Sequence, residues 1–269
     1  MSDLEPELSE RDLPADVLAL REQAVREHEV FDDHLQVRID AHLNAYDGVI
    51  DALITTHKAI ADRTDLEIGA DTRWSAMWEL AGRCLAVSRV VLNDLRGGFA
   101  SEADGSLRGL HEVTQLLVAL SIAGEEEDAL RRWLADEYIK PATVRKILDR
   151  HQQRARAAAA AAGDEEEVGD VGVLSLDIYQ RLSKSAHHRR RGFPESVAPA
   201  LREFTYGPHP NAPIRADHVV FAGLLLEEVV IVVGGAFSRI LGPGQGFLEA
   251  IVPPLIAAIT LARQLFPLE

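Results

Sequence analysis

The chain has little of what stabilises exported or zinc-bound proteins. Its 269 residues include one cysteine, Cys84, so no disulfide can form within it, and it has no CxxC pair or Cys/His cluster to hold a structural zinc ion. The first residues are acidic, whereas an export signal begins with a basic segment followed by an apolar run. The sequence therefore predicts a cytoplasmic protein.

Motifs of the common enzyme classes are also missing. The sequence contains no GxGxxG or GxxxxGK[ST] for nucleotide phosphates, no HExxH and no GxSxG. No histidine follows a glutamate by three residues, so the Glu-x-x-His pairs of a carboxylate-bridged two-metal bundle are absent. We therefore expect no metal ion and no other cofactor.

Positive charge is scarce. The chain has 28 Lys and Arg residues against 43 Asp and Glu residues, a formal net charge of −15. A protein that coats nucleic acid needs a broad basic face, because phosphate affinity comes mainly from charge neutralisation. We therefore expect no DNA partner, and any contact with RNA must be local.

The first 65 residues hold much of the negative charge, with 16 acidic and 6 basic side chains. Apolar residues recur there at steps of three and four from Leu13 to Ile60, which predicts a helix of about fifty residues that could divide at Gly48. A single apolar stripe must pack against the rest of the chain or against a second copy. We interpret residues 1–66 as an acidic assembly element, a helix or helix pair, and expect a homodimer.

Residues 67–269 are predicted to form one helical domain. Helical spacing of apolar residues recurs along them, and the one short segment with strand composition, 229–233, has no partner strand. The expected fold is all-α, a bundle of roughly eight helices with a long N-terminal helix. Beyond that helix we expect helices over 74–95, 107–122, 125–138, 141–162, 174–185, 197–204, 217–241 and 247–266, a left-handed cap at Gly97-Gly98, a loop over 99–105 and an acidic linker near 163–170.

The run from residue 219 to 237 is apolar enough to raise the question of a membrane span. Glu227 and Glu228 lie at its middle, where charge is costly in lipid, and Pro253-Pro254 interrupts the next predicted helix. We therefore expect a buried core helix and no membrane partner.

The positive signal is a short basic segment, residues 181–191, with five Lys or Arg side chains and no acid. Within it Arg181 precedes His187 by six residues, close to a predicted helix end. A guanidinium can stabilise the extra charge of a pentavalent phosphorane, while an imidazole that titrates near neutrality moves the proton. Such a pair suffices for RNA cleavage without a metal.

An all-α chain with this Arg-to-His motif resembles the HEPN superfamily (higher eukaryotes and prokaryotes nucleotide-binding). The resemblance rests on the motif and on Arg/Glu pairs within helices, Glu79 with Arg83 and Arg108 with Glu112. It implies a metal-independent endoribonuclease of toxin–antitoxin, abortive-infection or CRISPR-associated type, whose site two protomers or domains commonly share.

On this resemblance Arg181 and His187 are the catalytic residues, and an antitoxin or regulatory partner is expected. We expect four further side chains to bind the RNA backbone: Lys184, His188, Arg189 and Arg190. The chain departs from many active members at Leu182, where they carry a polar residue directly after the arginine.

The same spacing recurs at Arg145 and His151, and a looser spacing relates Arg21 to His28 and Arg202 to His209. Acid-free basic surroundings, a helix end and the neighbouring His188 favour Arg181 and His187 over these rivals. Arg145 and His151 lie within a predicted helix, where six residues turn two side chains about 120° apart.

Each of these features has a structural alternative. The cations of the basic segment could neutralise helix C-terminal carbonyls and pair with acidic helices, which makes the chain a non-catalytic interaction or regulatory scaffold that oligomerises through its N-terminal helix. Arg108 and Glu112 could orient the basic segment or form an intrahelical ion pair. Trp74, Trp78 and Trp133 could stack RNA bases or fill the core.

Overall fold

The structure is a computed structural model. It describes residues 15–66, 68, 69, 72–97, 99–122, 126–162, 180, 182, 197–198, 203–204, 212–242, 253, 256 and 260, with side chains for most of those from residue 34 onward but not for the strands or for 212–217.

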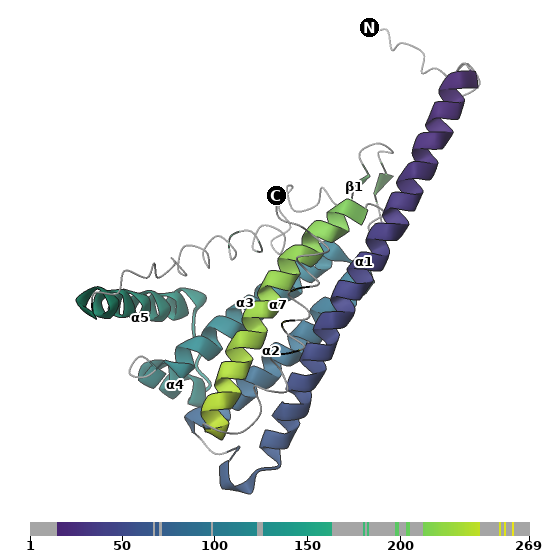
Figure 1. The fold of residues 1–269 in the computed structure, drawn as a ribbon. Coiled ribbons are helices and arrows are strands. Elements are labelled where there is room, and N and C mark those ends of the chain that lie inside the picture. The colour runs from purple at the N-terminus through teal and green to yellow at the C-terminus, as the bar shows by residue number, and fades with distance from the viewer. Residues whose placement is uncertain are drawn as a thin grey trace.

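The described part of the chain is almost entirely helical, which confirms the all-α prediction (Figure 1). One 3-10 turn, Thr64–Leu66, and two strands of two residues each, β1 Val197–Ala198 and β2 Glu203–Phe204, accompany the helices. The α-helices are α1 Ala15–Ala61, α2 Arg73–Arg96, α3 Ala100–Ser121, α4 Glu126–Leu134, α5 Pro141–Ala162 and α7 Ala212–Leu241.

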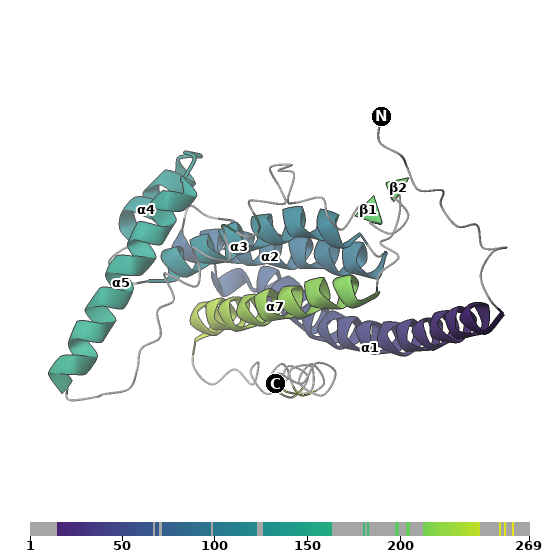
Figure 2. The same ribbon diagram turned by 90° about the horizontal axis from the view of Figure 1, so that it is seen from above.

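Four helices form the core. The C-terminal half of α1 packs with α2, α3 and α7 into a bundle, as Figures 1 and 2 show from two directions. Each large apolar side chain removed from water contributes about 1.5–3 kcal/mol of favourable transfer free energy. The fully buried side chains include Ile39, Leu43, Ile50, Leu53, Met77, Leu80, Leu92, Leu107 and Phe237.

Charged side chains tie α1 to α2 at the bundle surface. Arg89 pairs with Asp47 and Asp51, and Arg96 pairs with Asp47 and donates to the amide oxygen of Asn44 at 3.0 Å. Arginines on α2 therefore neutralise part of the negative charge of α1.

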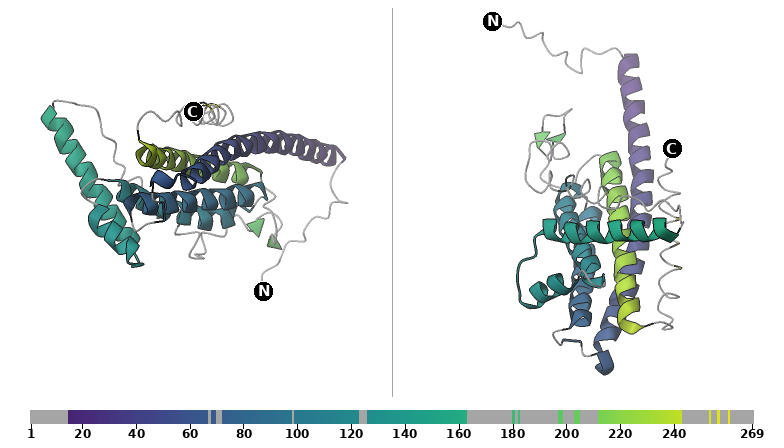
Figure 3. Two further views of the ribbon diagram at one scale, coloured as in Figure 1. Left: turned by 90° about the horizontal axis from the view of Figure 1, so that it is seen from below. Right: turned by 90° about the vertical axis from the view of Figure 1, so that its left-hand side faces the viewer.

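Helix α1 is longer than the bundle. Its 47 residues span about 70 Å at 1.5 Å per residue. Its N-terminal half extends past the ends of α2, α3 and α7 in both views (Figures 1 and 2). At the other end of the molecule, α4 and α5 pack on α3, and α5 leads away from the bundle axis (Figure 3).

Helix α7 contains the apolar run. By length and composition, His218–Leu241 is the one helical stretch in the described ranges that could cross a membrane, and 56% of its apolar 18-residue window is buried inside the protein. It packs against α1, α2 and α3, so the predicted core helix is present here. Leu224 and Ile231 lie on its exposed side.

The predicted loop at 99–105 is wrong, because α3 begins at Ala100. Ala103 and Asp104 are buried against the bundle, and this burial outweighs the low helix propensity of Gly105. The predicted left-handed cap is also wrong at Gly97, which is right-handed at φ −67° and donates to the Asn93 carbonyl at 2.9 Å.

Two further boundaries differ. The helix expected over 197–204 is instead a pair of antiparallel strands with Val197 opposite Phe204. Pro199 disfavours helical backbone at the preceding residue, which favours the extended conformation seen at Val197–Ala198. The helix expected to reach Tyr138 ends at Leu134, and Asp136 then takes a left-handed conformation at φ 54°.

Candidate functional site

Within the basic segment the structure describes Leu182 alone, and it also describes Gln180 just before the segment. Leu182 is completely buried and belongs to the hydrophobic core, while Gln180 is exposed. All of the predicted catalytic and RNA-binding residues lie outside the described part: Arg181, Lys184, His187, His188, Arg189 and Arg190. Leu182 therefore has a packing role, which accounts for an apolar residue at this position.

Arg108 and Glu112 form the intrahelical ion pair that their spacing predicts. Arg108 Nε donates to Glu112 Oε1 at 3.1 Å on α3, with both side chains partly buried. Their proposed support of the basic segment stays a prediction, because the partners it needs lie outside the described residues.

The tryptophans have three different environments. Trp78 stacks on His57 with ring centroids 4.3 Å apart, and its indole Nε1 donates to the His57 carbonyl at 3.0 Å, which joins α2 to α1. Trp74 lies partly exposed beneath the guanidinium of Arg73. Trp133 is partly buried against the core and also lines a cavity described below.

A buried polar network runs between α1 and α7. Tyr46 Oη donates to Glu227 Oε1 at 2.7 Å, and burial together with this hydrogen bond raises the pKa of Tyr46. The ring of His42 packs edge-on against Tyr46, with centroids 4.9 Å apart. Burial lowers the pKa of His42 to about 4, so this imidazole is neutral in the folded protein at pH 7.

The network continues on α3. His111 Nδ1 lies 3.7 Å from Glu228 Oε2, and Gln115 Nε2 lies 3.0 Å from His111 Nε2. With the amide as donor, His111 Nε2 accepts and the imidazole proton faces Glu228. At the other end of α7, His218 Nδ1 lies 3.2 Å from Asp104 Oδ1, with both side chains buried.

Cys84 lies beside this network but is not poised for nucleophilic chemistry. Its sulfur is 3.7 Å from Thr114 Oγ1, and burial raises the pKa of the thiol to about 12. A nucleophilic cysteine needs the opposite shift. The network is therefore a set of polar contacts inside the bundle, held by the Tyr46–Glu227 hydrogen bond and the His111–Gln115 contact. Sequence analysis missed it because its members lie on three different helices.

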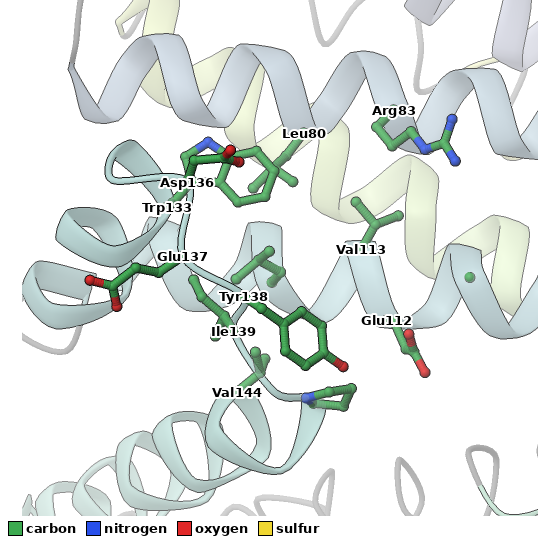
Figure 4. A pocket seen from close by; sticks show the side chains of 13 residues that line it. Leu80, Arg83, Glu112, Val113, Trp133, Asp136, Glu137, Tyr138, Ile139 and Val144 are labelled. Carbon is green, nitrogen blue, oxygen red and sulfur yellow. The ribbon is translucent and has the colours of Figure 1, made fainter.

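A separate cavity of about 470 Å³ lies where α2 and α3 meet the connection between α4 and α5 (Figure 4). Its floor is apolar and its rim carries charged side chains, among them Glu112 of the predicted ion pair. The lining residues are Leu80, Arg83, Gly109, Glu112, Val113, Leu116, Trp133, Asp136, Glu137, Tyr138, Ile139, Pro141 and Val144.

No group of three metal-ligating side chains is present among the residues that the structure describes. Comparison with protein-family models, with curated proteins and with solved structures finds no match to this chain.

Proposed function

We propose that the protein is a cytoplasmic, HEPN-like endoribonuclease of toxin or phage-defence type that cleaves RNA without a metal ion. The observation that carries the proposal is the basic segment: five cations and no acid within a chain of net charge −15, joined to the bundle by the buried Leu182. A local positive field in an acidic body concentrates phosphate at one place.

The chemistry assigns a role to each predicted residue. His187 takes the proton of the RNA 2′-hydroxyl, whose oxygen attacks phosphorus, or returns a proton to the departing 5′-oxygen. Arg181 stabilises the negative charge of the phosphorane. The bond to the 5′-oxygen breaks and leaves a 2′,3′-cyclic phosphate and a 5′-hydroxyl. Lys184, His188, Arg189 and Arg190 hold the RNA backbone, and Arg108 with Glu112 support the segment from α3.

The finer architecture belongs to the same proposal. The chain would form a bundle of roughly eight helices, with residues 67–269 as its HEPN-like domain. The long N-terminal helix would close a homodimer in which two basic segments share one cleft. An antitoxin or regulatory partner would then control access to that cleft.

Cleavage of a mixed RNA pool in the presence of EDTA tests the proposal. We expect the wild-type protein to cleave and Arg181→Ala and His187→Ala to be inactive. His151→Ala is the matched control, because His151 follows Arg145 by the same spacing but lies on α5. A wild-type protein without activity, or His187→Ala with full activity, contradicts the proposal.

The length of α1 favours a second candidate function, a non-catalytic interaction scaffold that self-associates through this helix. Its N-terminal half extends beyond the bundle (Figure 2), and by spacing Phe31 continues the apolar stripe that includes the buried Leu35 and Ile39. Such a stripe is buried by pairing with a second helix.

Sedimentation measurements on two adjacent variants test the scaffold. Phe31→Glu places a charge on the stripe and should shift the protein to monomer, whereas Val30→Glu, about 100° around the helix, should leave the mass unchanged. A wild-type protein that is monomeric at all concentrations contradicts self-association through α1.

A further inference from the structure

The cavity between α2, α3 and the α4–α5 connection has the form of a small-molecule site. Its volume, about 470 Å³, lies within the range of about 300–1,000 Å³ that is typical of ligand pockets. Leu80, Val113, Leu116 and Val144 supply apolar surface, and a small number of charged groups lie around it. This combination can cover the apolar part of a ligand while the charged groups fix its orientation.

Two of the four charged side chains that line the cavity form ion pairs with neighbouring arginines. Glu112 is paired with Arg108 at 3.1 Å, and Glu137 is paired with Arg132 at 3.1 Å. Each of these pairs is neutral as a whole. Figure 4 shows Glu137 pointing away from the cavity.

Arg83 and Asp136 are the remaining two charged groups of the lining, one of each sign. Figure 4 shows them on opposite sides of Leu80, so the apolar floor separates the positive end of the cavity from the negative end. A ligand that satisfies both ends must carry two opposite charges joined by an apolar body.

The backbone of the α4–α5 connection holds this arrangement in place. Asp136 is the only non-glycine residue with positive φ in the described chain, at 54°, a conformation that Asp tolerates better than most residues. Its amide donates to the Trp133 carbonyl at 3.0 Å, and the buried Ile139 fixes the connection three residues later.

Two aromatic side chains border the space between the charged ends. Trp133 is partly buried in its wall, while Tyr138 is 75% exposed at its edge. An indole and a phenol ring can cover an aliphatic or aromatic ligand body without restricting its identity.

We propose that this cavity binds a small amphipathic zwitterion, with its ammonium group at Asp136, its carboxylate at Arg83 and its apolar body over Leu80 and Val113. A guanidinium binds a carboxylate in a bidentate manner, and an ammonium is matched by a carboxylate. The site is independent of RNA cleavage and would add a small-molecule ligand to the protein.

Calorimetric titration of the full chain with three probes of one length tests the proposal. Aminohexanoate carries both charges, hexanoate carries the carboxylate alone and hexylamine carries the ammonium alone. We expect aminohexanoate to bind at millimolar concentration or below and about threefold to fivefold more tightly than either single-charge probe, as partly exposed ion pairs allow.

Charge-removing variants should change this order in opposite ways. Asp136→Asn, which keeps the tolerance for positive φ, should make aminohexanoate no better than hexanoate. Arg83→Gln should make it no better than hexylamine. Asp128→Asn is the matched control, because Asp128 lies on α4 in an exposed pair with Arg131 and does not line the cavity, so the order should remain that of the wild type.

Tryptophan fluorescence is a second measurement of aminohexanoate binding. Aminohexanoate should change the emission of the wild-type protein and leave that of Trp133→Phe unchanged, although Trp74 and Trp78 remain. Failure of all three probes to bind, equal affinities for all three, or an order that Asp136→Asn and Arg83→Gln do not alter, overturns the proposal.

Discussion

Single polar side chains in the core hold α1 and α7 in register. The Tyr46 hydroxyl reaches Glu227 across the bundle, and a buried donor and acceptor are costly when either loses the other. Apolar contacts alone would tolerate small shifts of one helix along another. The hydrogen bond at 2.7 Å selects one alignment.

Removal of the Tyr46 hydroxyl should therefore destabilise the fold. We expect Tyr46→Phe to lower the free energy of unfolding by about 1–3 kcal/mol, because Glu227 loses its donor. Urea unfolding followed by circular dichroism measures the change. Tyr138→Phe removes the same group from an exposed side chain and should change stability by less than about 0.5 kcal/mol. Equal effects of the two substitutions would show that the Tyr46–Glu227 bond contributes nothing.

His42 should make stability depend on pH. Burial lowers its pKa to about 4 in the folded protein from an ordinary value of 6.5, so between these values the unfolded chain binds a proton that the folded chain does not. Stability is therefore full above pH 6.5 and falls as the pH drops toward 4, by at most roughly 3 kcal/mol from this group.

Unfolding free energies measured across this pH window test the prediction. His42→Gln should lose that part of the pH dependence, while His151→Gln, at an exposed position on α5, should keep it. A His42→Gln profile parallel to that of the wild type would contradict a neutral, buried His42.

Close packing of α1 against α7 determines at which glycines of α7 a Cβ atom can be added. A Cβ at Gly223 would lie 2.9 Å from His42 Nε2 and 3.5 Å from Tyr46 Oη, whereas a Cβ at Gly234 or Gly235 would meet nothing within 4 Å. His42 is buried, so it cannot move aside without disturbing its neighbours.

Three alanine substitutions on α7 therefore have predictable signs. Gly223→Ala should lower the free energy of unfolding by about 1–3 kcal/mol through overpacking. Gly234→Ala and Gly235→Ala should raise it by about 0.5–1 kcal/mol, because alanine is the better helix former. Thermal unfolding of the three variants separates the cases, and stabilisation by Gly223→Ala would contradict the close approach of α1 to α7.

At the level of helices and strands, the sequence predicts helices well where an apolar period runs for many turns, as in α2, α5 and α7. It predicts poorly where a few residues decide. The strands at Val197 and Phe204 depend on one proline and on pairing of two short backbone segments, and the early start of α3 depends on the burial of Ala103.

In the candidate sites too, local spacing predicts some contacts, and others follow only from the tertiary structure. The spacing of Arg108 and Glu112 predicts their ion pair, because both groups lie on one helix. Glu227 and Glu228 stand out in an apolar run, but their partners Tyr46 and His111 lie on other helices and follow only from the tertiary structure. The cavity depends on a left-handed residue, Asp136, that no periodicity indicates.

In the proposed function, the distribution of charge over the whole molecule determines where RNA binds. An acidic body repels RNA and leaves the basic segment as the place of contact, so binding should involve few phosphates. With five cations in the segment, the logarithm of the RNA association constant should fall with the logarithm of salt concentration with a slope no steeper than about −3.5.

Filter binding of single-stranded RNA to the His187→Ala variant, which would bind without cleaving, measures this slope. Arg189→Gln with Arg190→Gln should make the slope shallower by about 1.4, since each neutralised phosphate contributes about 0.7. A slope far steeper than −3.5, or one that the double substitution leaves unchanged, would place RNA on another surface.

The central claim is that Arg181 and His187 cleave RNA through attack of its own 2′-hydroxyl. Mass spectrometry of the RNA termini produced in EDTA tests it most directly. The account predicts 2′,3′-cyclic phosphate and 5′-hydroxyl ends from the wild-type protein and from His151→Ala, and intact RNA with Arg181→Ala or His187→Ala. Intact RNA with the wild-type protein, or the same cyclic ends from His187→Ala, would contradict it.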